Sequence, residues 1–173
     1  ADLDRAADAY RRILELDADN LGAMHALQRV YERAERWTDL VKMLEREAER
    51  TPGEHVVSIL QRIGEVLEDK IGDRDAALAT YRRVLAIDPR FPPVLKALGR
   101  LYYQRGRWDD LLDMYRKELE VVGNREETVP LLFKMGEIYA DRLAREDDAI
   151  RCYQEALSVD PSYQPALAAL SHI

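Results

Sequence analysis

The chain has a single cysteine, Cys152, among its 173 residues. An internal disulfide framework and a cysteine-based metal cluster are therefore excluded. Long apolar runs are also missing. The longest ones are about the length of Val56–Leu60, whereas a bilayer span needs roughly 20 residues. No basic leader followed by an apolar stretch is visible in the sequence. We expect no membrane partner, and we take the cytoplasm as the default compartment.

Basic residues are fewer than acidic ones. The chain carries 26 Lys and Arg against 33 Asp and Glu, which gives a net charge of −7. A protein that binds nucleic acid needs a cationic face for the phosphates, and an anionic membrane surface attracts cationic segments in the same way. The sequence therefore predicts neither nucleic acid nor a membrane surface as the main partner.

Motifs for catalysis are missing too. The three histidines have no partner at metal-ligand spacing, and no GxGxxG, GxxxxGK[ST] or GxSxG motif is present. Cys152 has no histidine close in sequence, which favours an inert structural thiol. The acidic pairs at 109–110 and 147–148 fall in expected first helical turns, where the helix dipole favours them. We expect no enzyme activity, catalytic residue, cofactor or metal.

Alternation of apolar and polar residues, the pattern of a strand, is absent from the sequence. Strong helix formers fill the segments between the seven prolines, and apolar residues recur at steps of three and four. The pattern predicts an all-α fold. We expect helices at residues 2–16, 20–35, 37–50, 54–70, 73–87, 91–106, 108–122, 126–143, 146–159 and 162–172.

Three sequence patterns recur at one common offset, which indicates an internal repeat of about 71 residues. The unit is a pair of helical hairpins, each of about 35 residues, and two of the hairpins (54–88 and 126–160) carry an extra residue at the bend. The recurring segments are AYRRILELD (9–17), TYRRVLAID (80–88) and CYQEALSVD (152–160); ALQRVYERAERWTDL (26–40) and ALGRLYYQRGRWDDL (97–111); and RIGEVLEDK (62–70) and KMGEIYADR (134–142).

Residues 98–119 resemble a tetratricopeptide repeat (TPR). They have its Leu-Gly pair, a tyrosine one turn later, a glycine at the bend and an aromatic residue that opens the second helix. Residues 135–161 resemble another, with Ala149, Tyr153, Ala156 and a closing Asp-Pro. The sequence departs from the family pattern at Gln28, where glycine is preferred, and at Leu40 and Leu111, where a small residue is usual.

The resemblance covers nearly the whole chain and points to a multi-repeat protein of bacterial type. It implies a superhelical solenoid of antiparallel helix pairs, with about ten helices. We expect residues 1–173 to form one domain that is a segment of a longer array. The complete repeats are expected at about 20–50, 54–88, 91–122 and 126–160, and partial repeats at 1–17 and 162–173.

The spacing also predicts the core. In the first helix of each hairpin, a glycine follows the middle residue of the apolar stripe, and we expect it to allow close approach of the paired helix. Tyrosines of the second helices are expected in the core rather than in a ligand-stacking ladder. The predicted core residues are Met24, Leu27, Tyr31, Leu60, Ile63, Leu67, Leu95, Leu98, Tyr102, Leu132, Met135, Tyr139, Tyr10, Tyr81, Tyr115 and Tyr153, with Gly64, Gly99 and Gly136 beside them.

The resemblance implies that first helices line a concave face on which extended peptides or partner helices lie. The residue after the glycine position alternates in charge along Arg29, Glu65, Arg100 and Glu137. This pattern fits either a ladder of ion pairs between repeats or a groove for a partner of mixed charge. A clamp that grips a chaperone's C-terminal carboxylate is rejected, because the glutamates would repel that carboxylate. The candidate partner-binding residues are His25, Arg29, Arg33, Gln61, Glu65, Asp69, Lys96, Arg100, Tyr103, Gln104, Phe133, Glu137 and Asp141, with Tyr103 and Phe133 as apolar anchors.

We therefore expect a non-enzymatic scaffold or adaptor that binds a peptide or helix of another protein. The alternative is structural self-assembly into a homo-oligomer through apolar end repeats. The candidate oligomer contacts are Leu3, Tyr10, Leu167, Leu170 and Ile173.

Overall fold

The structure is a computed structural model that describes residues 2–172, apart from the side chain of Val121. Throughout that range the secondary structure is helical and no strand is present, which confirms the predicted all-α fold. The chain forms two compact units, residues 1–94 and 95–173.

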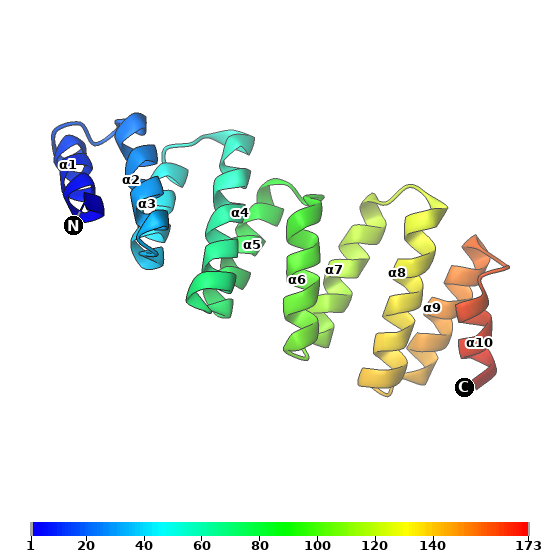
Figure 1. The fold of residues 1–173 in the computed structure, drawn as a ribbon. Coiled ribbons are helices and arrows are strands. Elements are labelled where there is room, and N and C mark those ends of the chain that lie inside the picture. The colour runs from blue at the N-terminus through cyan, green and yellow to red at the C-terminus, as the bar shows by residue number, and fades with distance from the viewer. Residues whose placement is uncertain (1, 173) are drawn as a thin grey trace. The chain divides into compact units, whose positions relative to one another are not determined.

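The first unit is a run of antiparallel helices, each packed on the next (Figure 1). A short 3₁₀ turn, η1 (Gly53–His55), precedes its fourth helix, and a π-helical turn, η2 (Leu67–Ile71), ends that helix. Its helices are α1 (Asp2–Leu16), α2 (Leu21–Arg33), α3 (Trp37–Ala48), α4 (Val56–Val66) and α5 (Arg74–Ile87).

The second unit repeats this pattern, again with a π-helical turn, η3 (Ile138–Arg142), at the end of a first helix. Its helices are α6 (Pro92–Gln104), whose start lies before the boundary, α7 (Trp108–Val121), α8 (Arg125–Glu137), α9 (Glu146–Val159) and α10 (Gln164–His172). In both units the helices lie within a few residues of the predicted ranges.

Side-chain caps fix three of the helix starts. The side-chain oxygens of Asn20, Asp73 and Asn124 accept hydrogen bonds from backbone amides three residues later, at 2.9, 3.0 and 2.9 Å. Such caps satisfy amides that have no partner within the helix and typically contribute about 1 kcal/mol each. They explain why α2, α5 and α8 begin one residue after an Asn or Asp.

The extra residue of the 54–88 and 126–160 hairpins lies in the π-helical turns η2 and η3. A π turn holds about one more residue than an α turn because its hydrogen bonds run from i to i+5. In η3, the amide of Leu143 donates to the carbonyl of Ile138 at 3.1 Å. The insertion predicted at the bend is therefore absorbed at the end of the first helix.

A residue in the left-handed region reverses the chain at each of the four bends between paired helices. Two bends use glycine, Gly72 with φ of 80° and Gly106 with φ of 64°. The other two use Glu35, with φ of 53°, and Ala144, with φ of 52°. A residue with a Cβ is strained there by roughly 1–2 kcal/mol. The packing of the paired helices must compensate for this strain.

The buried residues follow the predicted stripes at most positions. Met24, Leu27 and Ile63 are fully buried, and Tyr81 and Tyr153 are the tyrosines of second helices that lie in the core. The prediction was wrong at four positions, where the side chain is only half-buried. These are Leu67, Leu95, Tyr10 and Tyr115.

The register of the apolar face explains two of these corrections. Val66 and Val94, each one residue earlier, are buried in place of Leu67 and Leu95. In both helices the apolar face is wide enough for either stripe, and packing selects one of them.

The close approach predicted at the helix glycines is confirmed for two of the three. A Cβ on Gly64 would lie 2.2 Å from Cε1 of Tyr81, and a Cβ on Gly136 would lie 2.3 Å from Cε1 of Tyr153. At Gly99 the nearest atom is the terminal methyl of Met114, at 3.3 Å. A tyrosine ring thus fills the space above the glycine only in the hairpins that have a π turn.

Candidate partner-binding site

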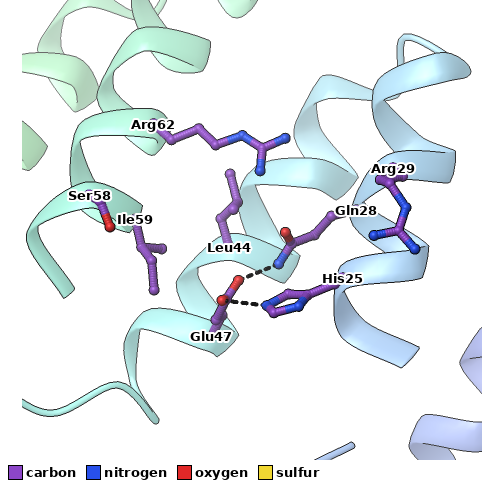
Figure 2. A pocket seen from close by; sticks show the side chains of 8 residues that line it. All are labelled: His25, Gln28, Arg29, Leu44, Glu47, Ser58, Ile59 and Arg62. Carbon is purple, nitrogen blue, oxygen red and sulfur yellow. Dashed lines mark hydrogen bonds and ion pairs between the residues drawn. The ribbon is translucent and has the colours of Figure 1, made fainter. Parts of the chain in front are cut away.

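A pocket of about 360 Å³ lies between α2, α3 and α4 in the first unit, and we name it the first pocket. Two cations and a histidine share it with an apolar floor and one glutamate. Figure 2 shows its lining side chains, which are His25, Gln28 and Arg29 from α2, Leu44 and Glu47 from α3, and Ser58, Ile59 and Arg62 from α4.

Glu47 is the polar centre of the first pocket. His25 Nε2 lies 2.8 Å from its Oε1, and Gln28 Nε2 donates a hydrogen bond to its Oε2 at 2.5 Å (Figure 2). Gln28 is only 4% exposed, so its amide depends on this contact. The residue that departs from the family's glycine therefore ties α2 to α3, and both oxygens of Glu47 are engaged.

Ion pairs link neighbouring hairpins of the first unit, although not between Arg29 and Glu65, the pair that the ladder of ion pairs would require. Arg62 of α4 pairs with Glu32 of α2 at 3.0 Å, and Arg83 of α5 pairs with Glu45 of α3 at 2.8 Å. Among residues 2–94 as described, no ion pair joins Arg29 to Glu65; instead Gln61 donates to Glu65 at 2.7 Å. Arg29 faces the pocket from α2.

The second unit has a pocket of about 270 Å³ between α6, α7 and the end of α8, and we name it the second pocket. Tyr103, 51% exposed, forms its aromatic wall, with its ring edge-on to Trp108 at a centroid distance of 5.1 Å. The lining residues are Tyr103, Tyr115, Lys134, Glu137, Ile138, Asp141 and Arg142.

Glu137 of the second pocket is harder to ionise than usual. Partial desolvation raises the pKa of Glu137, Asp141 raises it further, and Lys134 lowers it. The pKa of Glu118 on α7 is also raised, mainly by burial, with Lys134 acting against the shift and Glu127 with it. Lys134 therefore lowers the pKa of both Glu137 and Glu118, although other effects outweigh it at each.

The two pockets bring together five of the residues proposed for partner binding. His25 and Arg29 line the first pocket, and Tyr103, Glu137 and Asp141 line the second. The other charged and polar candidates lie on first helices outside both linings, and all but half-buried Gln61 are exposed. These are Arg33, Gln61, Glu65, Asp69, Lys96, Arg100 and Gln104.

Phe133 lies away from the second pocket. It is half-buried, and its ring centroid is 5.5 Å from that of Tyr153 and 5.7 Å from that of Tyr163. Of the two expected aromatic anchors, Tyr103 lines the second pocket and Phe133 does not.

The residues proposed for self-assembly differ in exposure. Leu167 is 41% exposed, whereas Leu3, Tyr10 and Leu170 are half-buried. Ile173 lies outside the described residues.

Apart from Gln28 on α2, the lining residues that sequence reasoning missed come from second helices and from the next hairpin. Arg62 and Lys134 occupy the same position in the repeat, and this recurrence of a basic residue was a readable signal. Glu47 and Tyr115 offered no such signal, because their role depends on which helix they face. The missed residues are Gln28, Leu44, Glu47, Ser58, Ile59, Arg62, Tyr115, Lys134, Ile138 and Arg142.

The part of the chain that the structure describes has neither a metal cluster nor a membrane span. No group of three or more His, Cys, Asp or Glu side chains there could hold a metal ion. None of the helices described has both the length and the apolar character to cross a membrane. Cys152 is buried, and burial together with nearby carboxylates raises the pKa of its thiol to about 11, so it stays protonated near neutral pH.

The fold and its pockets define a protein built from repeated helical hairpins. Sequence profiles described as tetratricopeptide repeat match residues 23–56, 72–110 and 93–162. The chain belongs to the tetratricopeptide repeat family, as its sequence pattern predicted. The repeats and the relatives with this fold support a protein-interaction scaffold, a class that is typically non-catalytic.

A curated relative is anaphase-promoting complex subunit 7 of Dictyostelium discoideum, which is 24% identical over 111 residues. That match covers 64% of this chain and 18% of the relative, so the chain spans less than a fifth of that protein's length.

Solved structures share the fold. A TPR protein from Bacteroides fragilis has a TM-score of 0.67 at 12% identity, and the match covers 99% of this chain and 92% of that protein's chain. YrrB, described as a TPR protein with an unusual peptide-binding site, has a TM-score of 0.52 at 20% identity, with 98% and 84% covered. MamA has a TM-score of 0.51 at 20% identity, with 92% and 90% covered.

Proposed function

We propose that this chain is a non-catalytic adaptor that binds an extended segment or a helix of a partner protein on its first-helix face. The observation that carries the proposal is the first pocket, which first helices α2 and α4 and second helix α3 enclose. YrrB, a protein of the same fold, is described as having a peptide-binding site, which supports the assignment.

The chemistry of the first pocket suits a polypeptide better than a small reactive substrate. Half-buried Ile59 offers apolar surface beside the fully buried Leu44, and the Ser58 hydroxyl and the Arg29 guanidinium can donate hydrogen bonds. Glu47 is already engaged by His25 and Gln28. Apolar contact would supply most of the affinity, and charge would set selectivity and the rate of encounter.

Charge reversal of Arg29 tests this proposal. Peptides are first selected from a random display library on the whole chain, and their affinity is then measured by fluorescence polarisation. Because Arg29 lies on the pocket wall, we expect Arg29→Glu to weaken the selected peptides about tenfold, or about 1.4 kcal/mol.

Arg12→Glu is the matched control, since it reverses an exposed arginine on α1 outside both pockets. It should change affinity less than about twofold, which is within about 0.5 kcal/mol. Unchanged affinity in Arg29→Glu, with helicity intact, would rule out the first pocket as the binding surface.

Self-assembly is the second candidate, and the exposure of α1 favours it. Tyr81 of α5 is 1% exposed, whereas the equivalent Tyr10 is half-buried; Val84 is fully buried, whereas the equivalent Ile13 is 41% exposed. Leu167 on α10 is also 41% exposed. Apolar faces of this kind can pair between copies of a chain.

Light scattering at two concentrations and two salt levels tests self-assembly. An apolar contact predicts a dimer or larger species that salt does not dissociate, and Leu167→Glu should reduce its mass. A mass near 20.0 kDa at every concentration would exclude it.

A further inference from the structure

The linings of the two pockets share two positions of the repeat, Leu44 with Tyr115 and Arg62 with Lys134, so the surroundings of these positions can be compared. The repeat aligns Glu32 with Tyr103 and Arg62 with Lys134. In the first unit, Arg62 pairs with Glu32 at 3.0 Å. Tyr103 stands in the place of Glu32 and cannot provide this carboxylate. The second pocket therefore has a different distribution of charge.

Arg142, at the end of η3, is held by aromatic rings. Its Nη2 donates a hydrogen bond to the hydroxyl of Tyr103 at 2.8 Å, and its guanidinium carbon lies 5.4 Å from the ring centroid of Trp108. The equivalent Lys70 lies over Trp37 in the same way, at 5.3 Å. The contact recurs in both units, which indicates that Arg142 serves to hold the end of η3 against the preceding hairpin.

Lys134 acts on the charge of Glu137 without a direct ion pair. The side chains of Glu137 and Asp141 are exposed, and no ion pair in the described part of the second unit includes either of them. Lys134 lowers the pKa of Glu137, but desolvation and Asp141 outweigh it, so the pKa is raised. A further cation close to Glu137 would favour its charged form.

The walls of the second pocket suit the stem of a long basic side chain. Tyr103 and Tyr115 present aromatic surface, and the buried Ile138 also lines the pocket. The methylene groups of lysine or arginine pack on such surfaces while the charged head stays at the rim. At that rim it meets the two carboxylates, where charge-assisted hydrogen bonds form.

We propose that the second pocket receives an arginine or lysine side chain of the bound partner segment, with its cationic head on Glu137 and Asp141 and its stem against Tyr103 and Tyr115. This inference rests on the proposed function, because it gives the chemistry of one residue in the partner segment. It assigns the second pocket a preference for positive charge.

The test uses the whole chain with Trp37→Phe, so that Trp108 provides the tryptophan emission. Trp108 contacts Tyr103 and Arg142, both of which line the pocket. The probe is the peptide Ac-Gly-Arg-Gly-Arg-Gly-NH₂, and its glutamate counterpart is the comparison. We expect a saturable change with the arginine peptide at a dissociation constant about tenfold lower than with the glutamate peptide, and weaker binding at high salt.

Amide replacements identify the carboxylates. Glu137→Gln with Asp141→Asn keeps the side-chain shapes and should raise the dissociation constant of the arginine peptide about tenfold. The matched control is Glu65→Gln with Asp69→Asn, at the equivalent positions of the first unit, where we expect less than about a twofold change. Circular dichroism is used to check that both variants fold.

Three results would overturn the inference: no saturable change in Trp108 emission, an equal loss in both double variants, or tighter binding of the glutamate peptide. The proposed function fails on a separate result, which is that the selected peptides bind Arg29→Glu with unchanged affinity. Selected peptides that depend on Arg29, without a response to the arginine probe, would refute only the role of the second pocket.

Discussion

Alanine in place of Gly136 is expected to lower the free energy of unfolding by about 1–3 kcal/mol. The added Cβ would lie 2.3, 2.7 and 2.8 Å from three carbons of the Tyr153 ring. Tyr153 is 3% exposed, so its ring has no free space to enter. The steric cost outweighs the helix propensity of alanine, which favours the replacement by about 1 kcal/mol. Urea unfolding followed by circular dichroism measures the change.

Two other glycines serve as controls for Gly136→Ala. A Cβ on Gly123 would have nothing within 4 Å, and Gly99 faces the flexible end of Met114 at 3.3 Å. Alanine at either should change the stability by less than about 1 kcal/mol. In a Tyr153→Leu background the cost of Gly136→Ala should fall, because the ring edge is gone. The same cost in both backgrounds would contradict the proposed clash.

Replacement of Glu47 by leucine is expected to lower the free energy of unfolding by about 1–3 kcal/mol. The leucine keeps most of the volume but cannot accept a hydrogen bond. The amide of Gln28, which is 4% exposed, then loses the partner that it holds at 2.5 Å. The contact of His25 with the same carboxylate, at 2.8 Å, is lost as well. Urea unfolding again provides the measurement.

The second unit provides the matched control, Glu118→Leu. Glu118 occupies the place of Glu47 in the repeat and Gly99 the place of Gln28, so no buried amide at that position depends on the carboxylate. Burial raises the pKa of Glu118, which shows that its charged form is disfavoured there. We expect this replacement to leave stability unchanged or to increase it. Equal destabilisation by Glu47→Leu and Glu118→Leu would show that loss of the Gln28 contact is not the cause.

Much of the fold could be predicted because its information is local and repeated. Apolar spacing and caps set the helices, and the common offset of the recurring segments sets the hairpins. The roles of Gly64 and Gly136 followed from the repeat, since a helix glycine is costly unless a neighbour needs the space. Leu95 was misassigned because Val94 lies on the same wide apolar face, and the choice between them depends on packing against other helices.

The candidate site was predictable only in part. Helical periodicity identified residues that share one face of one helix, which was enough for His25 and Arg29. Each pocket, however, is enclosed by three helices. Glu47 and Arg62 enter the first pocket from α3 and α4, and the sequence does not specify how far these side chains reach across the gap. The second pocket likewise depends on side chains from other helices than the one that carries Tyr103.

The left-handed bends at Glu35 and Ala144 bear on how this chain can change over evolution. Gly72 and Gly106 show that the same bend accepts glycine, so each of the two strained positions leaves roughly 1 kcal/mol of stability unused. Natural proteins are seldom at their stability optimum. A single-residue change outside the pocket linings could therefore offset a destabilising substitution within one. The repeat can in this way accept new pocket residues, and so new partners, without loss of the fold.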